Sequence, residues 1–321
     1  MYLNFIMNWG WTMYLHRDDR ELFCDIITTV SEKSGIDESI VEKDYYVTLI
    51  LRELVERMPN IVFKGGTSLS KAHQIIERFS EDIDITFSEH IGKARRKKIK
   101  YNLMWSIGED LGLPIDNWDN IESNKDYNHY DFTYESISKS GQNILIPYIK
   151  VETALMSYSF PTERREIKSI IYENMKKSDL KILNEYKMVP FSMNVQCLER
   201  TFIDKLFALC DYYMNNKPVR NSRHLYDIYK IFPYIILNEE FYHLVDEVRV
   251  HRNDMDIKFT PSARTTVDMV QIGKEIVDSN FYRRDYENST RKLINEDVSY
   301  AEVIQCYNRI MNDVFFKSEN V

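Results

Sequence analysis

Apolar residues recur at helical spacing along residues 40–54, at Ile40, Val47, Ile50, Leu51 and Leu54. This spacing places them on one side of an amphipathic α-helix, and Asp37 stands where its side chain would cap the first free amides. The next apolar run, Ile61-Val62-Phe63, is short, β-branched and aromatic, and it ends at Lys64-Gly65-Gly66. Such a run predicts a buried strand that leads into a tight turn.

A second predicted helix follows the two glycines directly. Thr67 or Ser68 can cap its N-terminus with a side-chain oxygen. One apolar stripe runs down its side and consists of Leu69, Ala72, Ile76 and Phe79. We expect this stripe to pack on the sheet to which the preceding strand belongs.

Residues 82–87 alternate strictly between polar and apolar side chains, as in a strand with one buried face. Ile83, Ile85 and Phe87 share the apolar face, so Asp82, Asp84 and Thr86 share the other one. A second alternating run, residues 144–155, places Lys150 and Glu152 together on one face. The polar stretch between the two runs, residues 116–131, is rich in Asn and Asp and is predicted to be a loop.

From Val195 onward the apolar period becomes helical. Two stripes follow, formed by Phe202, Leu206 and Leu209 and by Leu225, Ile228 and Ile231. A chain of 321 residues is longer than one core usually needs, so two domains are expected. We place them at residues 1–195 and 196–321, in an α+β fold: a mixed sheet flanked by helices, then a mainly helical C-terminal domain.

Composition excludes several classes of protein. No stretch approaches the roughly 20 apolar residues of a membrane helix. Residues 1–15 lack a basic leader and a small-residue cleavage site, so we expect no signal peptide and a cytoplasmic protein. The cysteines are scattered without Cys-x-x-Cys spacing, which favours reduced thiols over a disulfide frame or a zinc site; they are Cys24, Cys197, Cys210 and Cys306.

The net charge of -8 excludes a broadly basic surface for nonspecific nucleic-acid binding. Any polyanion must therefore meet a local basic patch. One run offers such a patch, with Lys93, Arg95, Arg96, Lys97, Lys98 and Lys100. A run of this kind fits either contact with an RNA or the solvated face of a helix.

The pair Asp82 and Asp84 is the first candidate for catalysis. Two carboxylates on one strand face repel each other, and burying them is costly unless a cation neutralises them. Oxygen ligands select a hard ion such as Mg²⁺ or Mn²⁺. In a two-metal site one ion activates the attacking hydroxyl and the other holds the triphosphate. Glu152, on a neighbouring strand, would complete the metal ligation, or would pair with Lys150 as a surface residue.

The glycine turn strengthens the prediction that Asp82 and Asp84 are catalytic. Gly65 and Gly66 let the backbone approach a ligand, and the start of the next helix offers free N–H groups to phosphates. The order of strand, turn, helix and Asp-x-Asp strand sets a phosphate-binding turn beside a metal site. The turn, with Lys64, Gly65, Gly66, Thr67 and Ser68, is therefore predicted to bind an NTP. The alternative is an ordinary glycine turn next to surface aspartates.

These motifs resemble the AbiEii/AbiGii family of bacterial nucleotidyltransferase toxins, within the DNA polymerase beta-like superfamily. The likeness covers most of residues 41–228, and it is specific because several blocks occur in the same order. The blocks read VEKDYYVT from Val41, FKGGTSLSKA from Phe63, RFSEDIDI from Arg78, ERTFIDKL from Glu199 and RHLYDI from Arg223.

This resemblance implies a polymerase-beta-like domain followed by a helical domain, with NTP at the glycine turn and metal at the first aspartates. It also implies a lysine and an aspartate required for activity, which match Lys205 and Asp227 by position. Family members transfer nucleotides from an NTP to RNA, notably to the tRNA acceptor end. They belong to toxin-antitoxin and abortive-infection systems for phage defence, and an antitoxin encoded alongside counters them.

Several alternatives stay open. Asp227 could bind metal, accept a proton, orient Lys205, or form a salt bridge that only ties two helices together. Lys43 and Asp44 could pair with each other or brace the site. The acceptor could instead be a small molecule or a protein hydroxyl. A non-catalytic NTP-binding defence subunit is a further alternative, against which the intact Asp82 and Asp84 argue.

Overall fold

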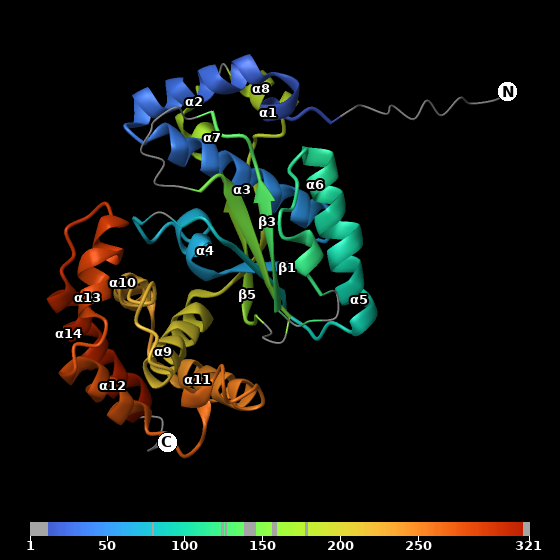
Figure 1. The fold of residues 1–321 in the computed structure, drawn as a ribbon. Helices are drawn as coiled ribbons and strands as arrows, with labels where there is room; N and C mark the ends of the chain where they lie inside the picture. Colours follow the sequence, from blue (N-terminus) through green and yellow to red (C-terminus); the bar gives the residue numbers. More distant parts are fainter. Residues whose placement is uncertain are drawn as a thin grey trace.

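A six-stranded mixed sheet forms the centre of the protein (Figure 1). The computed structural model describes residues 12–78, 80–122, 125, 127–137, 146–155, 159–176 and 179–316. In chain order the strands are β1 (Ile61–Lys64), β2 (Ile83–Phe87), β3 (Tyr127–Thr133), β4 (Tyr148–Ala154), β5 (Thr162–Ile167) and β6 (Phe191–Gln196). Across the sheet their order is β3-β4-β2-β1-β6-β5.

The three central strands bring predicted site residues side by side. β1 is antiparallel to β2, with Lys64 opposite Asp84. β2 is parallel to β4, with Asp84 opposite Glu152. Because paired residues point to the same face of a sheet, Lys64, Asp84 and Glu152 form a row across one face. The two predicted alternating strands are therefore confirmed as β2 and β4, although residues 144 and 145 lie outside the described part.

Helices cover the other face of the sheet. The predicted helix at residues 40–54 is confirmed as α3 (Glu38–Arg57), and Asp37 caps it by accepting a hydrogen bond from the Ser39 amide. Apolar side chains of α3 pack in one core with the inward residues of β2 and β4. The other α-helices before β6 are α1 (Leu15–Asp18), α2 (Arg20–Ser34), α4 (Gly65–Lys71), α5 (Lys93–Lys98), α6 (Ser106–Leu111), α7 (Ile170–Asn174) and α8 (Leu180–Glu185).

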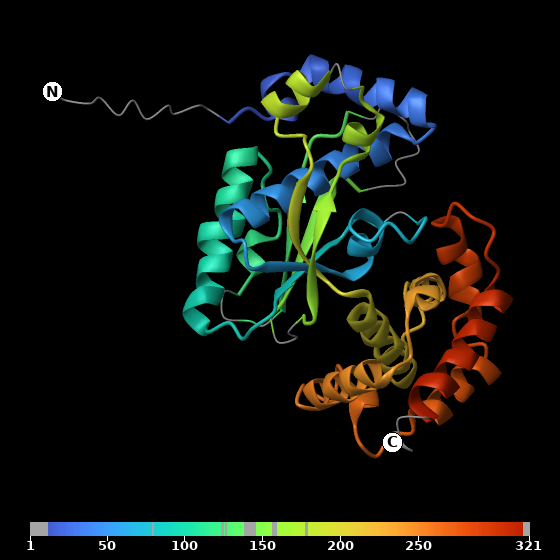
Figure 2. The ribbon, with the colours of Figure 1, turned by 180° about the vertical axis from the view of Figure 1, so that it is seen from behind.

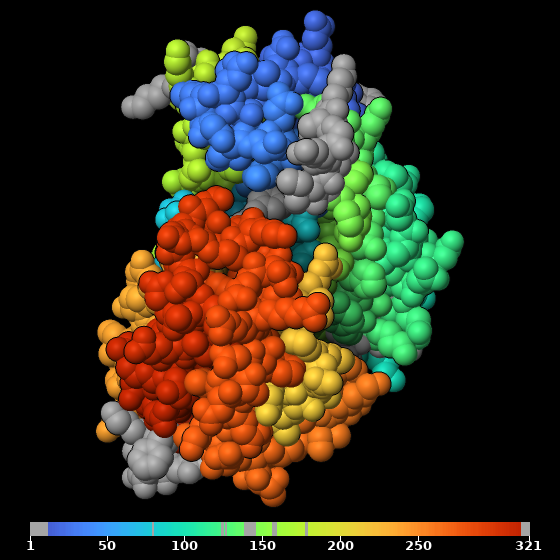
Figure 3. All heavy atoms as spheres, turned by 60° about the vertical axis from the view of Figure 1, so that its left-hand side comes forward, coloured from blue at the N-terminus to red at the C-terminus, as the bar shows by residue number. Residues whose placement is uncertain are grey.

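The chain after β6 is helical, as predicted. Its α-helices are α9 (Leu198–Met214), α10 (Arg223–Ile231), α11 (Glu239–Asn253), α12 (Met269–Asp278), α13 (Arg283–Asn288) and α14 (Tyr300–Met311). They gather at one end of the sheet (Figures 1 and 2), and their outer face lies below the N-terminal helices (Figure 3). They have a hydrophobic cluster of their own, separate from the cluster at the sheet. The exact division at residues 195 and 196 stays a prediction.

The helix after the glycines differs from its prediction. α4 begins at Gly65 itself, and Lys64 at its N-cap position makes no side-chain capping bond. Thr67 and Ser68 lie inside α4, so the prediction that one of them caps the helix is wrong. The helix ends at Lys71, and Gln74 adopts a φ of 56°, which a right-handed helix cannot accommodate.

The apolar stripe of this segment is divided between the two cores. Ala72 packs in the sheet cluster, but Leu69 and Ile76 pack in the C-terminal cluster. The prediction that the stripe packs on the sheet is therefore wrong for both of these residues, and Phe79 lies outside the described residues. The segment between the glycine turn and β2 thus ties the C-terminal helices to the sheet.

Part of the predicted loop at residues 116–131 is a strand. Only its first portion is irregular, with a 3₁₀ turn at Trp118–Asn120, whereas β3 begins at Tyr127 and buries Tyr130 and Phe132. β5 was not predicted either. Its sequence, TERREI, is mostly charged because it forms an edge of the sheet with alternate side chains in solvent.

Three further expectations concern membrane helices, the cysteines and a signal peptide. In the portion of the chain with described coordinates, no helix is both long and apolar enough to cross a membrane. All four cysteines are free thiols, as expected. Residues 1–11, which make up most of the segment judged for a signal peptide, lie outside the described residues.

Candidate active site

The glycine turn packs tightly against the aspartate strand. Gly65 has a φ of 78°, which L side chains rarely adopt, and a Cβ there would lie 2.7 Å from the Asp84 carboxyl carbon. A Cβ on Gly66 would lie 2.9 Å from the Ser80 hydroxyl and even closer to the Arg78 guanidinium. Both glycines are therefore needed for the backbone of the turn to lie beside Asp84 and Arg78.

Negative charge accumulates beside this turn. Asp84 lies next to Glu152 in the sheet, and Asp82 precedes β2 directly. Burial and then the charges of Glu152 and Asp82 raise the pKa of Asp84 to about 7, although Lys64 and Lys205 oppose the rise. A carboxylate with such a raised pKa favours a cation beside it.

A buried ion cluster stands on the opposite wall. Asp227 has no exposed surface. Its carboxylate accepts hydrogen bonds from Arg78 Nε at 2.6 Å, Arg78 Nη2 at 2.8 Å and Lys205 Nζ at 2.7 Å. Burial alone would raise the pKa of Asp227, but Arg78 and Lys205 hold it far below its usual range. One carboxylate thus orients two cations, one from each half of the chain.

His224 adds a neutral partner to this cluster. Its Nδ1 lies 3.4 Å from Lys205 Nζ. Burial, and then the charge of Lys205, lower the pKa of His224 well below its ordinary value. The ring is therefore neutral near pH 7, and Nδ1 can accept a hydrogen bond from the Lys205 ammonium.

Except for Asp227, these groups surround one cavity of about 390 Å³ between the sheet and the C-terminal helices. This volume is in the roughly 300–1,000 Å³ range of small-molecule sites. Its charged and glycine lining consists of Lys64, Gly65, Gly66, Arg78, Asp82, Asp84, Glu152, Asp204, Lys205, Arg223 and Arg252. Lys64, Asp84 and Glu152 line the sheet side, and the helical side carries Asp204 together with the cations Lys205, Arg223 and Arg252.

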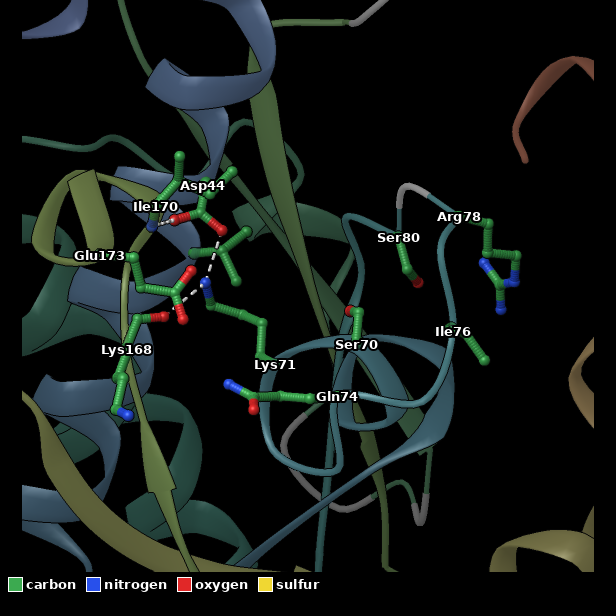
Figure 4. A pocket seen from close by; sticks show the side chains of 11 residues that line it. Asp44, Ser70, Lys71, Gln74, Ile76, Arg78, Ser80, Lys168, Ile170 and Glu173 are labelled. Carbon is green, nitrogen blue, oxygen red and sulfur yellow. Dashed lines mark hydrogen bonds and ion pairs between the residues drawn. The ribbon is translucent and has the colours of Figure 1, made fainter. Parts of the chain in front are cut away.

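A neighbouring cavity of about 380 Å³ lies beside the end of α4 (Figure 4). Arg78 and Ser80 line both cavities. In the second one, Asp44 binds Lys71 Nζ at 2.5 Å and accepts a hydrogen bond from the Ile170 amide at 2.8 Å (Figure 4). Asp44 thus fixes the end of α4 against α3 and the first residue of α7.

Lys43 and Asp44 do not pair with each other, so that alternative is wrong. Lys43 is almost fully buried and forms an ion pair with Glu81, the residue before Asp82. It also donates to the Ile146 carbonyl at 2.8 Å. The two residues brace the segment that follows the glycine turn, at the end of α4 and just before β2.

Most of the predicted site residues meet in the larger cavity, but Thr67 and Ser68 turn away from it. The Thr67 hydroxyl bonds to the Asp82 carbonyl, and the Ser68 hydroxyl donates to the Gly65 carbonyl at 2.8 Å. Both side chains are fully buried, so their hydroxyls support the turn from inside and are not available to a ligand. Asp227 lies behind Lys205 and does not line the cavity.

The basic run lies away from this cavity, since none of its described side chains forms the wall. Its helix is α5, followed by the π-helical turn η1 (Ile99–Trp105). Lys100 is buried and donates to the Ile121 carbonyl at 2.5 Å. The prediction that Lys100 is available to an RNA is therefore wrong, because its ammonium is already bound inside the protein.

The structure adds two residues that the sequence reasoning missed. Arg78 stands four positions before Asp82 and is the first residue of the block RFSEDIDI. Asp204 directly precedes Lys205 and lines the cavity, where Gln196 Nε2 donates to it at 3.2 Å and Arg200 Nε at 3.3 Å. Burial opposes ionisation of Asp204, but Arg200 and other cations lower its pKa. The only sequence signal for Arg78 and for Asp204 was that each lies within four positions of a predicted site residue.

The donor set of the cavity suits a hard divalent ion. Within the described residues, no group of three or more His, Cys, Asp or Glu side chains is arranged as a closed metal site. Mg²⁺ does not require one, because it binds through one or two carboxylates plus waters and substrate phosphates. The raised pKa of Asp84, between Asp82 and Glu152, fits a place for a cation.

The chain is similar to known nucleotidyltransferase toxins. Among solved structures, MenT4, a nucleotidyltransferase toxin from Mycobacterium tuberculosis H37Rv, is similar over 92% of each chain, with 14% sequence identity and a TM-score of 0.44. A likeness of this size supports no residue assignment. No curated protein matches the chain. A family profile described as "Nucleotidyl transferase AbiEii toxin, Type IV TA system" matches residues 49–308, which include the glycine turn, both aspartates, Lys205 and Asp227. The chain therefore belongs to the AbiEii family of nucleotidyltransferase toxins of type IV toxin-antitoxin systems.

Proposed function

We propose that the protein transfers a nucleotide from an NTP to the 3′ hydroxyl of an RNA and releases pyrophosphate. The acceptor that the family likeness favours is the 3′ end of a tRNA. The observation that carries this proposal is the single cavity in which the glycine turn, the row of Asp84 and Glu152, and the cations Lys205 and Arg78 face one another. One wall suits metal and the other suits phosphate.

The glycine turn and two cations would hold the triphosphate. Gly65 and Gly66 line the cavity, so their backbone lies within reach of a bound triphosphate. α4 has only seven residues, so we assign most of the charge compensation to Lys205 and Arg78 rather than to a helix dipole. A fixed cation there stabilises charge that develops on the departing pyrophosphate. Since Asp227 is buried behind both cations, we assign it a positioning role.

The carboxylates Asp82, Asp84 and Glu152 would bind Mg²⁺ or Mn²⁺. A bound ion of this kind neutralises the triphosphate and makes an attacking hydroxyl more acidic. The carboxylates also keep the acceptor hydroxyl near the α-phosphate by accepting a hydrogen bond from it. Asp84 and Glu152 come from the sheet, whereas Lys205 comes from α9 and Arg78 from the segment before β2.

The biological setting follows from the family. An antitoxin is the partner of a type IV toxin, and we propose that it is encoded next to this chain and acts with it in the cytoplasm in phage defence. Transfer to a small molecule or to a protein hydroxyl is the main alternative. A non-catalytic NTP-binding subunit is disfavoured by the assembled Asp82, Asp84 and Lys205.

One experiment separates these functions. The protein is incubated with α-labelled NTPs and Mg²⁺, together with total RNA, with cell protein or with buffer alone. Label should appear in RNA, and in the tRNA fraction after gel separation. Asp84→Asn should abolish the transfer, whereas Asp246→Asn, an exposed carboxylate on α11, should keep it. Label in protein or in a small product would refute the RNA assignment, and transfer by Asp84→Asn would refute the site.

A further inference from the structure

An exposed surface of aromatic and basic side chains lies beside the edge of the sheet. α5 and η1 form one continuous helix next to β3 (Figure 1). Lys97, Tyr101 and Trp105 recur on it at four-residue intervals, so they share one side. Tyr101 is 46% exposed and Trp105 is 44% exposed. Large aromatic side chains gathered at a surface mark an interaction site more often than isolated ones do.

A third ring makes this surface rigid. Trp118 lies 4.7 Å from Trp105 and 5.7 Å from Tyr101, measured between ring centroids. Lys100 Nζ stands 4.5 Å from the Trp118 centroid and 5.3 Å from that of Tyr101. Because Lys100 is itself fixed by the Ile121 carbonyl, its buried ammonium holds both rings in place by cation–π contact.

Exposed lysines precede the aromatic rings on the same continuous helix. Lys93, Lys97 and Lys98 are exposed on α5. Lys97 Nζ lies 6.0 Å from the Tyr101 ring centroid, at the margin of a cation–π contact. This arrangement combines stacking faces with positive charge, although the whole chain carries a net charge of -8. Positive charge on α5 and stacking faces on η1 are therefore neighbours on one helix.

The surface continues toward the active site along β3. The turn that carries Trp118 borders a cavity of about 340 Å³, which is also lined by Asn120, Lys125, Tyr127 and His129. Tyr127 is 54% exposed and pairs with Ala154, which lines the catalytic cavity. His129 pairs with Glu152. Residues paired in a sheet share a face, so Tyr127 and His129 connect this edge to the carboxylates.

We propose that this surface, the edge platform of Lys97, Tyr101, Trp105, Trp118 and Tyr127, binds the single-stranded 3′ end of the acceptor RNA. Unpaired bases stack on the exposed rings and their phosphates contact the lysines, as in other single-strand binders. The strand then passes β3 and brings its last hydroxyl to Glu152. This inference rests on the proposed function for its choice of RNA, and it adds the binding surface and the single-stranded character of the acceptor.

The test measures binding by the full chain, without turnover. A fluorescent 12-nucleotide RNA is titrated with wild type and with Tyr101→Ala/Trp105→Ala, and a blunt RNA duplex of the same length serves as a second ligand. The double variant should bind the single strand at least about 10-fold more weakly, with NTP affinity unchanged. Tyr234→Ala removes a ring that is 58% exposed on the C-terminal half and should bind like wild type. Tyr101→Phe/Trp105→Phe keeps the stacking faces and should restore binding.

The charges are tested separately. Lys97→Glu/Lys98→Glu should lower the slope of log affinity against log salt by about 1.4, since each phosphate contact to a single strand contributes roughly 0.7. Lys274→Glu reverses an exposed charge on α12 and should leave the slope unchanged. Melting temperatures of all variants identify any change that comes from unfolding.

Equal binding of single strand and duplex by wild type would overturn the inference, as would full affinity in Tyr101→Ala/Trp105→Ala or an equal loss in Tyr234→Ala. Turnover distinguishes it from the proposed function. If wild type transfers nucleotide to RNA but the double variant keeps its KM for RNA, only the edge platform is wrong. If wild type binds single strands through the platform but transfers nothing to RNA, only the proposed function is wrong.

Discussion

Replacing Asp227 with asparagine tests whether one buried carboxylate holds both cations of the site. Asparagine keeps the shape of the side chain and removes the charge that Arg78 and Lys205 share. Removing one partner from a buried ion pair costs about 3–5 kcal/mol. Each 1 kcal/mol lowers the Tm of a domain-sized protein by about 2–4 °C, so the Tm of Asp227→Asn should fall by roughly 6–20 °C.

The pH dependence of this loss has a definite sign. The folded-state pKa of Asp227 is depressed, so its stabilisation is fully present above the unfolded pKa of about 3.9 and is lost only as the pH falls through the folded value. The Tm difference between wild type and Asp227→Asn should therefore be constant from about pH 5 to pH 8 and narrow only in strong acid.

Differential scanning calorimetry across this pH range provides the measurement. Asp246→Asn, an exposed carboxylate on α11, is the matched control and should melt like wild type. Adding Lys205→Met to Asp227→Asn removes one of the unpaired cations and should recover part of the lost stability. If Asp227→Asn melts like the control, or if its deficit grows as the pH falls from 8 to 5, then Asp227 does not hold the cations.

Three further outcomes are expected. Gly65→Ala should lose activity and stability because its Cβ would meet Asp84 at positive φ, whereas Gly92→Ala has no heavy atom within 4 Å and should be tolerated, as transfer assays and melting curves will show. Without divalent ions, Asp84→Asn should melt higher than wild type at pH 8, and this difference should shrink as the pH falls from 7 toward the unfolded pKa of about 3.9, because the raised folded pKa makes the Asp84 carboxylate destabilising only over that range and above it. Lys205→Ala should lower kcat by at least about 100-fold with its folded fraction checked by circular dichroism, and Lys274→Ala should not; equal losses in both would refute the role of Lys205.

The parts of the fold that the sequence predicted are those where local pattern and tertiary environment agree. Residues 82–87 alternate because β2 is buried on one face, and α3 keeps its apolar side toward the same core. β3 was missed although Tyr130 and Phe132 alternate there, since the neighbouring Asn and Asp residues are typical of loops. β5 gave no signal because an edge strand exposes most of its side chains.

Only part of the candidate site could be predicted from the sequence. Asp84 and Glu152 are 68 positions apart, and their neighbouring places followed from alternation on two strands. Arg78 could not be recognised, because its role depends on Asp227, which lies 149 positions later. Thr67 and Ser68 were misjudged for a related reason: whether a hydroxyl faces a ligand or the interior depends on where α4 begins, and only the packing of Gly65 against Asp84 determines that.

The apolar side chains of Leu69 and Ile76 lie in the core of the C-terminal helices although they come from the segment between the glycine turn and β2. A hinge between the two halves would have to pull these side chains out of that core, at a cost of several kcal/mol. The width of the catalytic cleft is therefore built in rather than set by substrate-driven closure. For a toxin this has a regulatory meaning: we expect that the enzyme is not controlled by separation of its two halves, since that would expose apolar side chains of both cores.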